Sequence, residues 1–248
     1  MKKILALSAV LALFASAAFA ATAMDKDTLI VGTEATYPPY ESYNEKGELA
    51  GFDIELSEII AERLGKKLEW VNMAFDSLIP SLIMGKVDFV AAGLSATEDR
   101  LKKVNFTAPY EISFSAFVTL PDNPPKTTDD LAGKIVATQI GTVQESFART
   151  LENVEVKTFQ KFDDCVREVI LGRAAATLMD IPVAKSYVQA KDFAGKVIIA
   201  FNKQITGADK AIATPKNDQP LTDAISKIID DMEKSGELAA LRAKWFTL

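Results

Sequence analysis

The residue with the clearest chemical use in this sequence of 248 residues is Arg100. It ends the segment 92–100, which directly follows a short apolar run predicted to be a strand. An arginine can hold a carboxylate through two parallel hydrogen bonds, because its guanidinium presents its donors in a planar fork. A solvated surface charge is the simpler interpretation of an isolated arginine. The position after a strand favours binding, since ligands of open parallel sheets bind beyond the carboxyl ends of the strands.

A second polar group lies at a predicted helix start in the other half of the chain. Thr142, Val143 and Gln144 open a helix predicted over 142–151. The unpaired N–H groups and the dipole of a helix start attract an anion. Thr142 is also an ordinary N-cap residue, and capping is compatible with ligand contact. Gln139, just before this start, offers a hydrogen bond to a guanidinium or an amide.

The residue inventory excludes several classes of enzyme. The sequence has no histidine and one cysteine, Cys165, so a zinc site, a Cys-His nucleophile and an intramolecular disulfide have nothing to be built from. Cys165 falls at helical spacing with apolar residues, which favours a buried thiol. No nucleophile-base pair, phosphate-binding glycine loop or cluster of metal ligands is found in the sequence. We therefore expect no catalytic residue, no metal and no cofactor.

Residues 1–20 have the three-part layout of a secretory signal peptide, with a second cleavage position after Ala23. Their apolar run is shorter than the ~20 residues that span a bilayer, and no cysteine follows to carry a lipid. We therefore expect a soluble, unlipidated periplasmic protein. Removal of Lys2 and Lys3 leaves 26 basic against 34 acidic residues, a net charge of −8. This charge disfavours nucleic acid as a partner.

After the signal, short apolar strands alternate with amphipathic helices, which predicts parallel sheets covered by helices. The predicted strands are 29–33, 68–71, 87–91, 134–138, 154–159, 175–179, 197–201 and 210–213. The predicted helices are 52–64, 76–84, 142–151, 162–171, 221–232 and 238–245. An even split would leave the first lobe with three strands, too few for a typical sheet, so the tail is assigned to it. The expected lobes are 24–114 plus 208–248 and 115–207.

Four segments together resemble the polar amino-acid-binding family of periplasmic solute-binding proteins. They are Gly-Thr-Glu-Ala-Thr-Tyr-Pro-Pro-Tyr at 32–40, Gly-Phe-Asp-Ile-Glu-Leu at 51–56, Gly-Leu-Ser-x-Thr-x-x-Arg at 93–100 with Phe-x-x-Pro-Tyr at 106–110, and Gly-Thr-Val-Gln-Glu at 141–145. The resemblance spans the whole mature chain in the family's order. The resemblance implies an α/β, two-lobed periplasmic-binding-protein fold of type II. In this fold each lobe is a mostly parallel sheet flanked by helices, and the ligand lies in the inter-lobe cleft.

The resemblance also implies how an amino acid would be held. Arg100 would pair with the α-carboxylate, helped by the Ser95 region and by backbone N–H groups around Val143 and Gln144. Asp180 would hold the α-ammonium, and the Gly93 carbonyl and the Ser95 hydroxyl would complete its shell. Without the resemblance, Asp180 is more simply a turn or cap residue before a proline.

For the ligand side chain, the family places aromatic residues at the positions of Tyr37 and Phe75, which the fold alone would treat as core. Glu34 lies where relatives that bind cationic amino acids have an acid, although a solvated loop charge is the alternative. Ala92 and Val143 stand where some relatives have a serine and a threonine. This difference removes two hydroxyls but no backbone donor, so it affects side-chain specificity rather than the carboxylate site.

The expected function is the substrate-binding component of an amino-acid ABC importer. It would bind a polar, cationic L-amino acid of the arginine, lysine or ornithine type by hinge closure, and deliver it as a monomer to an inner-membrane permease complex. One alternative is a periplasmic dehydratase acting on prephenate or arogenate, because such enzymes share this fold. Prephenate, however, has no α-ammonium for Asp180 to hold. A third alternative, the sensing domain of a receptor, would require a transmembrane helix and a signalling module.

Overall fold

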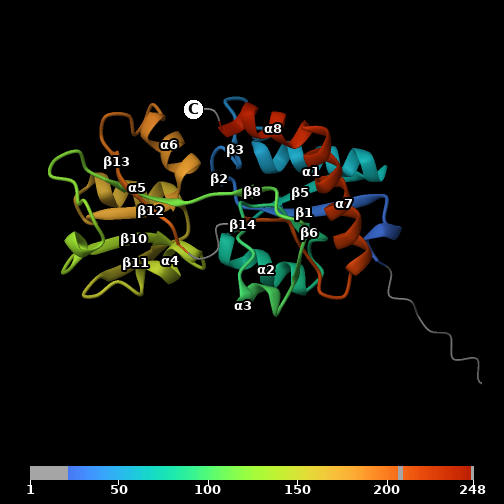
Figure 1. Cartoon of the computed structure of the whole chain (residues 1–248), viewed down its shortest axis with the longest axis horizontal. Coiled ribbons are helices and arrows are strands. Elements are labelled where there is room, and N and C mark those ends of the chain that lie inside the picture. Colours follow the sequence, from blue (N-terminus) through green and yellow to red (C-terminus); the bar gives the residue numbers. More distant parts are fainter. Residues whose placement is uncertain (1–21, 206–208, 247–248) are drawn as a thin grey trace, which may run out of the picture.

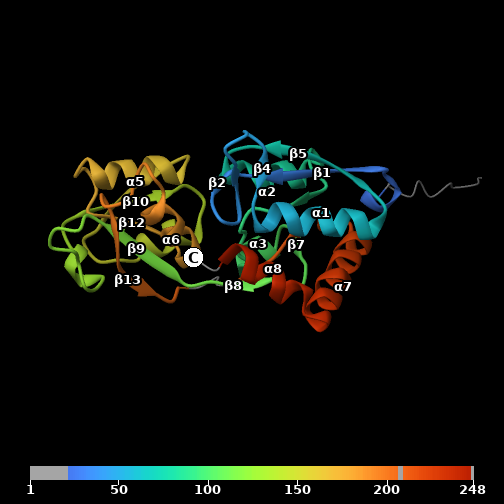
Figure 2. The ribbon, with the colours of Figure 1, turned by 90° about the horizontal axis from the view of Figure 1, so that it is seen from above.

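The chain folds into two α/β lobes that lie side by side, and it passes from one lobe to the other twice (Figures 1 and 2). The structure is a computed structural model that describes residues 22–205 and 209–246. The predicted signal peptide, residues 1–20, lies outside the described residues. Within the described part of the chain, no helix has both the length and the apolar character needed to cross a membrane.

The first lobe contains a five-stranded sheet in the order β5-β1-β6-β15-β7, in which β15 runs opposite to the other strands. Its strands are β1 (Thr28–Thr33), β5 (Lys67–Asn72), β6 (Phe89–Val90), β7 (Asn105–Phe106) and β15 (Ala213–Thr214). Its helices are α1 (Phe52–Leu64), α2 (Phe75–Ile83), α3 (Glu98–Leu101), α7 (Gln219–Ser235) and α8 (Glu237–Phe246), with a 3-10 turn at Ala23–Asp25. Figure 1 shows α1 and α2 on opposite faces of this sheet.

The second lobe repeats this arrangement with the order β11-β10-β12-β9-β13, in which β9 runs opposite to the others. Its strands are β9 (Ser115–Thr119), β10 (Ile135–Gln139), β11 (Glu155–Phe159), β12 (Ala176–Asp180) and β13 (Ile198–Lys203). Its helices are α4 (Val143–Ala148), α5 (Phe162–Ile170) and α6 (Ile181–Gln189), with a 3-10 turn at Asp129–Leu131. Both lobes therefore have mostly parallel sheets, as the sequence predicts.

Two short strands run between the lobes: β8 (Glu111–Ile112) and β14 (Asp209–Lys210), paired antiparallel. Ser95 forms an isolated antiparallel bridge with Lys210. Three further short strands, β2 (Thr36–Tyr37), β3 (Glu41–Tyr43) and β4 (Leu49–Ala50), form a small antiparallel sheet in the first lobe. This small sheet and the crossing strands bring side chains from distant parts of the sequence to the space between the lobes.

The alternation of apolar residues explains why the sheets are covered on both faces. In β1, Leu29 and Val31 pack into the core with Leu56 and Ile60 of α1, whereas Ile30 packs with the cluster around Leu78 of α2. Successive side chains of a strand point to opposite faces, so a strand with apolar residues at every position must be covered twice.

The helices and strands of the structure differ from the predicted ones at several places. The strand predicted over 87–91 is limited to β6, and the helix predicted over 142–151 ends at Ala148. The prediction of a single strand over 210–213 is wrong, because the chain leaves the crossing pair after Lys210 and enters the first sheet at Ala213. Helix α6 was not predicted, although Pro182 in its first turn is a typical helix-start residue.

Candidate functional site

A cavity lies between the two lobes, beyond the carboxyl ends of β1, β6 and β10. The space free of atoms between its walls is about 290 Å³, which includes open solvent at its mouth. It is lined by Glu34, Tyr37, Glu41, Phe75, Gly93, Ser95, Arg100, Gln139, Thr142, Val143, Gln144, Phe162 and Lys210. Its walls come from both lobes, so its shape depends on how the lobes meet.

The structure brings ten of the eleven predicted site residues to this cavity. They are Glu34, Tyr37, Phe75, Gly93, Ser95, Arg100, Gln139, Thr142, Val143 and Gln144. Asp180, the eleventh, is buried directly beside the cavity but does not line it. The ligand contacts predicted for these residues stay predictions.

Arg100 reaches across the cleft from the first lobe. Its Nη1 donates to the Ser95 carbonyl at 2.8 Å, and its Nη2 donates to the Gly141 carbonyl of the second lobe at 2.9 Å. The guanidinium lies 5.4 Å from the centre of the Phe75 ring, within the range of a cation–π contact. Burial lowers the pKa of Arg100 to about 10, so the group stays positively charged at neutral pH. These contacts hold the guanidinium at the cavity wall.

Glu34 supplies a negative group to the same cavity. Its Oε2 accepts a hydrogen bond from Gln139 Nε2 at 3.0 Å across the cleft, and the Thr36 hydroxyl lies within 2.9 Å of both of its oxygens. The residue is 4% exposed. Burial raises the pKa of Glu34, and the hydrogen bonds from Gln139 and Thr36 partly oppose this rise. A carboxylate here has lone pairs left for a further donor, and a cation beside it would stabilise its charge.

Aromatic rings form another part of the wall. The Tyr37 ring of the first lobe packs against Phe162, the first residue of α5, at a centroid distance of 4.8 Å. Tyr37 also stacks on Tyr40 at 5.6 Å. Because Phe162 belongs to the second lobe, this contact joins the hydrophobic cores of the two lobes.

The start of α4 is a capped helix end, as predicted. Thr142 Oγ1 accepts a hydrogen bond from the Glu145 N–H at 3.1 Å and donates to the Gln139 carbonyl at 2.7 Å. Gln144 points its amide inward, where Nε2 donates to Asp180 Oδ1 at 3.1 Å. Thr142 and Gln144 therefore fix the loop that carries Gln139 and Gly141 into the cleft.

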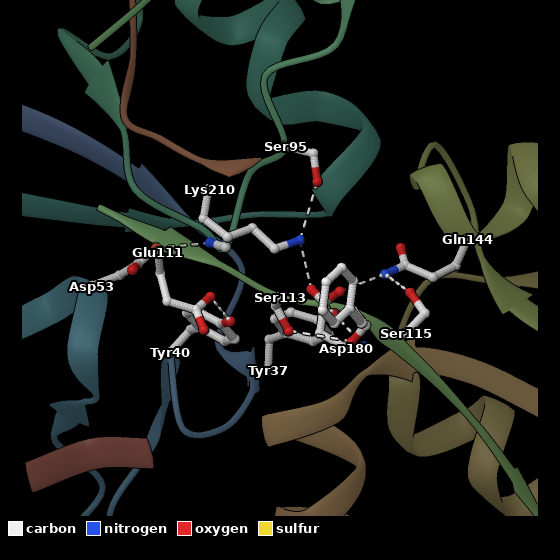
Figure 3. A network of polar contacts seen from close by, with 12 residues as sticks. Tyr37, Tyr40, Asp53, Ser95, Glu111, Ser113, Ser115, Gln144, Asp180 and Lys210 are labelled. Carbon is white, nitrogen blue, oxygen red and sulfur yellow. Dashed lines mark hydrogen bonds and ion pairs between the residues drawn. The ribbon is translucent and has the colours of Figure 1, made fainter. Parts of the chain in front are cut away.

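Asp180 is enclosed by donors from both lobes (Figure 3). Lys210 Nζ lies 2.6 Å from its Oδ2, and the Tyr37 hydroxyl donates to the same oxygen at 2.7 Å. Its backbone N–H in turn donates to the Tyr37 hydroxyl at 3.1 Å. Lys210 Nζ also donates to Ser95 Oγ at 3.0 Å. The ammonium group beside the Asp180 carboxylate is therefore that of Lys210.

Two further carboxyl groups of the first lobe lie at this cavity: Glu41 lines it, and Asp53 lies behind its wall. Asp53 Oδ2 accepts hydrogen bonds from the Gly93 N–H at 2.7 Å and from the Tyr110 hydroxyl at 2.8 Å. Burial nevertheless raises the pKa of Asp53 to about 7. Burial also raises the pKa of Glu41 well above its usual range, and the charges of Asp53 and Glu34 add to this rise. Within residues 22–205 and 209–246, no group of three or more histidine, cysteine or acidic side chains is arranged to hold a metal ion.

Three lining residues were not predicted from the sequence: Glu41, Phe162 and Lys210. Glu41 follows the Tyr-Pro-Pro-Tyr segment, and Phe162 opens a helix after a strand that ends near the cleft, so both follow predicted site elements. Lys210 is a charged residue at the start of an apolar run, Ala211 to Ala213, predicted to be a strand. A charge at that place, next to a predicted lobe crossing, is the feature that would have identified it.

The chain is similar to known proteins over most of its length. The chain is 34% identical over 225 residues to the arginine-binding extracellular protein ArtP of Bacillus subtilis, covering 90% of this chain and 87% of the relative. Among solved structures, an ancestral arginine-binding protein bound to arginine matches with 37% identity and a TM-score of 0.84, covering 89% of this chain and 99% of that chain.

A further structure is that of the ancestral amino acid-binding protein AncCDT-1, described as a precursor of cyclohexadienyl dehydratase. It matches with 34% identity and a TM-score of 0.82, covering 90% of this chain and 97% of that chain. These neighbours confirm the predicted two-lobed, type II fold. Residues 29–248 match the family model of the bacterial extracellular solute-binding proteins, family 3, which covers most of the chain. Two mostly parallel sheets, the cavity between them and these matches lead to one conclusion: the chain belongs to the bacterial extracellular solute-binding proteins of family 3.

Proposed function

We propose that this protein is the periplasmic substrate-binding component of an ABC importer, and that it binds a cationic L-amino acid such as arginine, lysine or ornithine between its two lobes. The observation that carries the proposal is the presence of opposite charges in one inter-lobe cavity: the guanidinium of Arg100 and the carboxylate of Glu34. A ligand with a carboxylate at one end and a cation at the other would satisfy both.

The contacts of each group support this assignment. Arg100 uses two of its five N–H donors on carbonyl groups, so further donors remain for a ligand carboxylate. Glu34 is desolvated, and a buried carboxylate is costly unless a cation or donors compensate it. Gln139 adds an amide whose carbonyl oxygen can accept from a guanidinium. The relatives whose names include arginine support the same side-chain class.

The proposed function also implies lobe boundaries, export, an oligomeric state and a closing movement for the chain. The lobes would comprise 24–114 plus 208–248 and 115–207, and the assignment of the described strands to two main sheets supports this division. Residues 1–20 would direct export, and the mature protein would act as a monomer that presents its closed form to a membrane permease. Ligand would favour the closed form because contacts from both lobes exist only there.

A thermal-shift screen with the twenty amino acids, ornithine and citrulline tests the proposal. A ligand that binds only the folded protein stabilises it by RT ln(1 + [L]/Kd), about 2.7 kcal/mol when its concentration is one hundred times Kd. We expect the largest rise in melting temperature with arginine, lysine or ornithine. If no amino acid raised the melting temperature, the proposed function would be contradicted.

The variant Glu34→Gln tests the cationic class. The substitution keeps the size of the side chain and an oxygen acceptor but removes the charge. We expect calorimetry to show a loss of at least about 2 kcal/mol in arginine binding, the size associated with breaking a buried charge pair, and a much smaller loss in glutamine binding. Equal losses for both ligands would contradict a cationic ligand.

The dehydratase alternative is tested separately. The neighbour described as a precursor of a dehydratase is itself named an amino acid-binding protein, and we propose binding without catalysis for this chain. Incubation of the protein with prephenate and with arogenate, followed by absorbance of an aromatic product, decides the question. Product formed at a rate that scales with protein concentration would establish an enzyme.

A further inference from the structure

The ammonium position beside Asp180 is filled by a side chain of the protein itself. Lys210 Nζ lies 2.6 Å from Asp180 Oδ2 and 3.0 Å from Ser95 Oγ, and the side chains of Lys210 and Asp180 are 2% and 3% exposed. Under the proposed function, Asp180 and Ser95 are the groups that would receive the α-ammonium of a bound amino acid. Two ammonium groups cannot occupy this position together.

The enclosure of Asp180 makes this competition direct. Its Oδ2 accepts from Lys210 and from Tyr37, and its Oδ1 accepts from Gln144. These three side chains line the cavity and Asp180 does not, so they separate the carboxylate from the space that a ligand can enter. An α-ammonium can reach Asp180 only if one of the three moves, and Lys210 is the one whose charge it would replace.

Lys210 has an alternative place for its charge. In Figure 3 the Lys210 side chain extends from β14 toward Asp180 and Ser95, and Glu111 and Asp53 lie to the left of its ammonium group. Burial raises the pKa of Glu111, Asp53 and Glu41, and the positive charge of Lys210 partly opposes this rise in each of them. An ammonium displaced from Asp180 would turn toward these carboxyl groups, so its displacement would cost less than leaving a buried charge without a partner.

The same ion pair joins the two lobes. Lys210 lies on the crossing strand β14 and bridges to Ser95 of the first lobe, whereas Asp180 ends β12 of the second. We propose that Lys210 is an internal substitute for the α-ammonium of the ligand: it holds the lobes together without ligand, and an amino acid must displace it from Asp180 and Ser95 to bind. This proposal rests on the proposed function and adds Lys210 as a residue that determines specificity.

A change in ligand preference follows. When an amino acid binds, its α-ammonium replaces another ammonium on Asp180, so the net gain from this group is small. A carboxylate that lacks the α-ammonium binds with Lys210 still in place. The wild-type protein should therefore discriminate weakly between an amino acid and its des-amino analogue, and removal of the Lys210 charge should sharpen this discrimination.

Calorimetry on wild type and Lys210→Met with L-arginine and 5-guanidinopentanoate, its des-amino analogue, measures this effect. We expect the Kd of 5-guanidinopentanoate divided by the Kd of L-arginine to be below about ten in the wild type. This ratio should rise at least tenfold in the variant. Lys86→Met, the same change at an exposed lysine after α2, is the matched control and should leave the ratio unchanged. A ratio in Lys210→Met that stays the same or falls would overturn the proposal. If another amino acid gives the largest thermal shift, it and its des-amino analogue are used instead.

Small-angle X-ray scattering without ligand tests the other half of the proposal. We expect Lys210→Met to have a larger radius of gyration than the wild type, because the lobes lose the ion pair between them. An unchanged radius would overturn the role of Lys210 in holding the lobes together. Lys210→Gln serves in both measurements if the methionine variant does not fold. If no amino acid binds wild type or variant, the proposed function fails, and scattering alone then decides whether Lys210 ties the lobes.

Discussion

Contacts within the protein hold the Arg100 side chain in place. Two carbonyl groups and the Phe75 ring fix its guanidinium at the cavity wall. We predict that Arg100→Ala weakens binding of the tightest amino acid by about 2 to 5 kcal/mol, because a ligand carboxylate then lacks its buried partner. Isothermal titration calorimetry checks this. Arg173→Ala, at a side chain that is 64% exposed on the second lobe, is the control and should bind normally. Unchanged affinity in a folded Arg100→Ala protein would contradict the assigned site.

Asp53 makes the stability of the protein depend on pH. Burial raises its folded-state pKa to about 7, whereas an unfolded aspartate titrates near 3.9. The folded state therefore holds this proton more tightly than the unfolded state does. The stabilisation is full below about pH 4, falls as the pH rises, and is lost above about pH 7. The raised pKa values of Glu34, Glu41 and Glu111 act in the same direction.

We predict that the free energy of unfolding of the ligand-free protein decreases from pH 5 to pH 8, and that Asp53→Asn reduces this decrease by about 1 to 3 kcal/mol. The asparagine keeps an oxygen for the Gly93 N–H and the Tyr110 hydroxyl but cannot ionise. Urea denaturation at both pH values is the measurement. Asp99→Asn, at an exposed residue of α3, should retain the wild-type pH dependence. An identical decrease in wild type and Asp53→Asn would refute the titration of Asp53 in this range.

At the scale of elements, the sequence predicts what local patterns determine. Helix α1 has apolar residues at helical spacing and ends at Gly65, whose φ of 65° suits a glycine after a helix, so its bounds agree with the prediction. The crossing strand β14 could not be predicted in the same way. Its two residues form a strand because β8, almost one hundred positions earlier, lies beside them. Non-local pairing of this kind leaves no period in the sequence.

In the candidate site, too, local sequence patterns predict some residues, and contacts between distant segments determine the others. Residues that follow long predicted strands, such as Glu34 after β1 and Gln139 in β10, are brought to the cavity as expected. Lys210 was missed because its place in the cleft depends on the crossing strands and not on its neighbours in the chain. Asp180 has the expected position at the end of β12, but its enclosure by Lys210 depends on contact between the lobes, which no local pattern encodes.

The turn after β6 depends on a glycine for two reasons. Gly93 has a φ of 53°, and a Cβ placed on it would lie 3.0 Å from Cδ1 of Tyr37. The ring cannot easily move, since Phe162 and Asp180 hold it. We predict that Gly93→Ala destabilises the protein by about 1 to 3 kcal/mol, combining the left-handed backbone cost with the displacement of Tyr37, and that it also weakens ligand binding.

Gly85→Ala is the matched control for this turn. Gly85 has a similar φ of 68°, but nothing lies within 4 Å of an added Cβ. It should show the backbone cost of about 1 to 2 kcal/mol in thermal or urea unfolding and no loss of binding. The difference in free energy of unfolding between Gly93→Ala and Gly85→Ala therefore measures the effect of the contact with Tyr37. If both variants lose the same stability and bind equally well, the close approach of Gly93 to the ring has no functional consequence.

At the scale of the whole molecule, the two lobes share one arrangement of strands and meet through polar contacts that cross the cleft. Arg100 with Gly141, Glu34 with Gln139, and Lys210 with Asp180 each join a residue of one lobe to a residue of the other. Backbone amides at the cleft should therefore exchange with solvent through separation of the lobes. A ligand that contacts both lobes must leave before they separate.

This linkage predicts that a bound ligand slows the exchange of backbone amide hydrogens equally on both sides of the cleft. At a ligand concentration one hundred times Kd, the open population falls about one hundredfold. Amide hydrogen exchange followed by mass spectrometry should therefore slow by the same factor in peptides covering 92–97 of the first lobe and 139–144 of the second. A peptide covering 227–234, on helix α7 away from the cleft, should exchange at its ligand-free rate. Protection confined to the peptides of one lobe would mean that the ligand binds to that lobe alone, and closure of the two lobes around it would have to be abandoned.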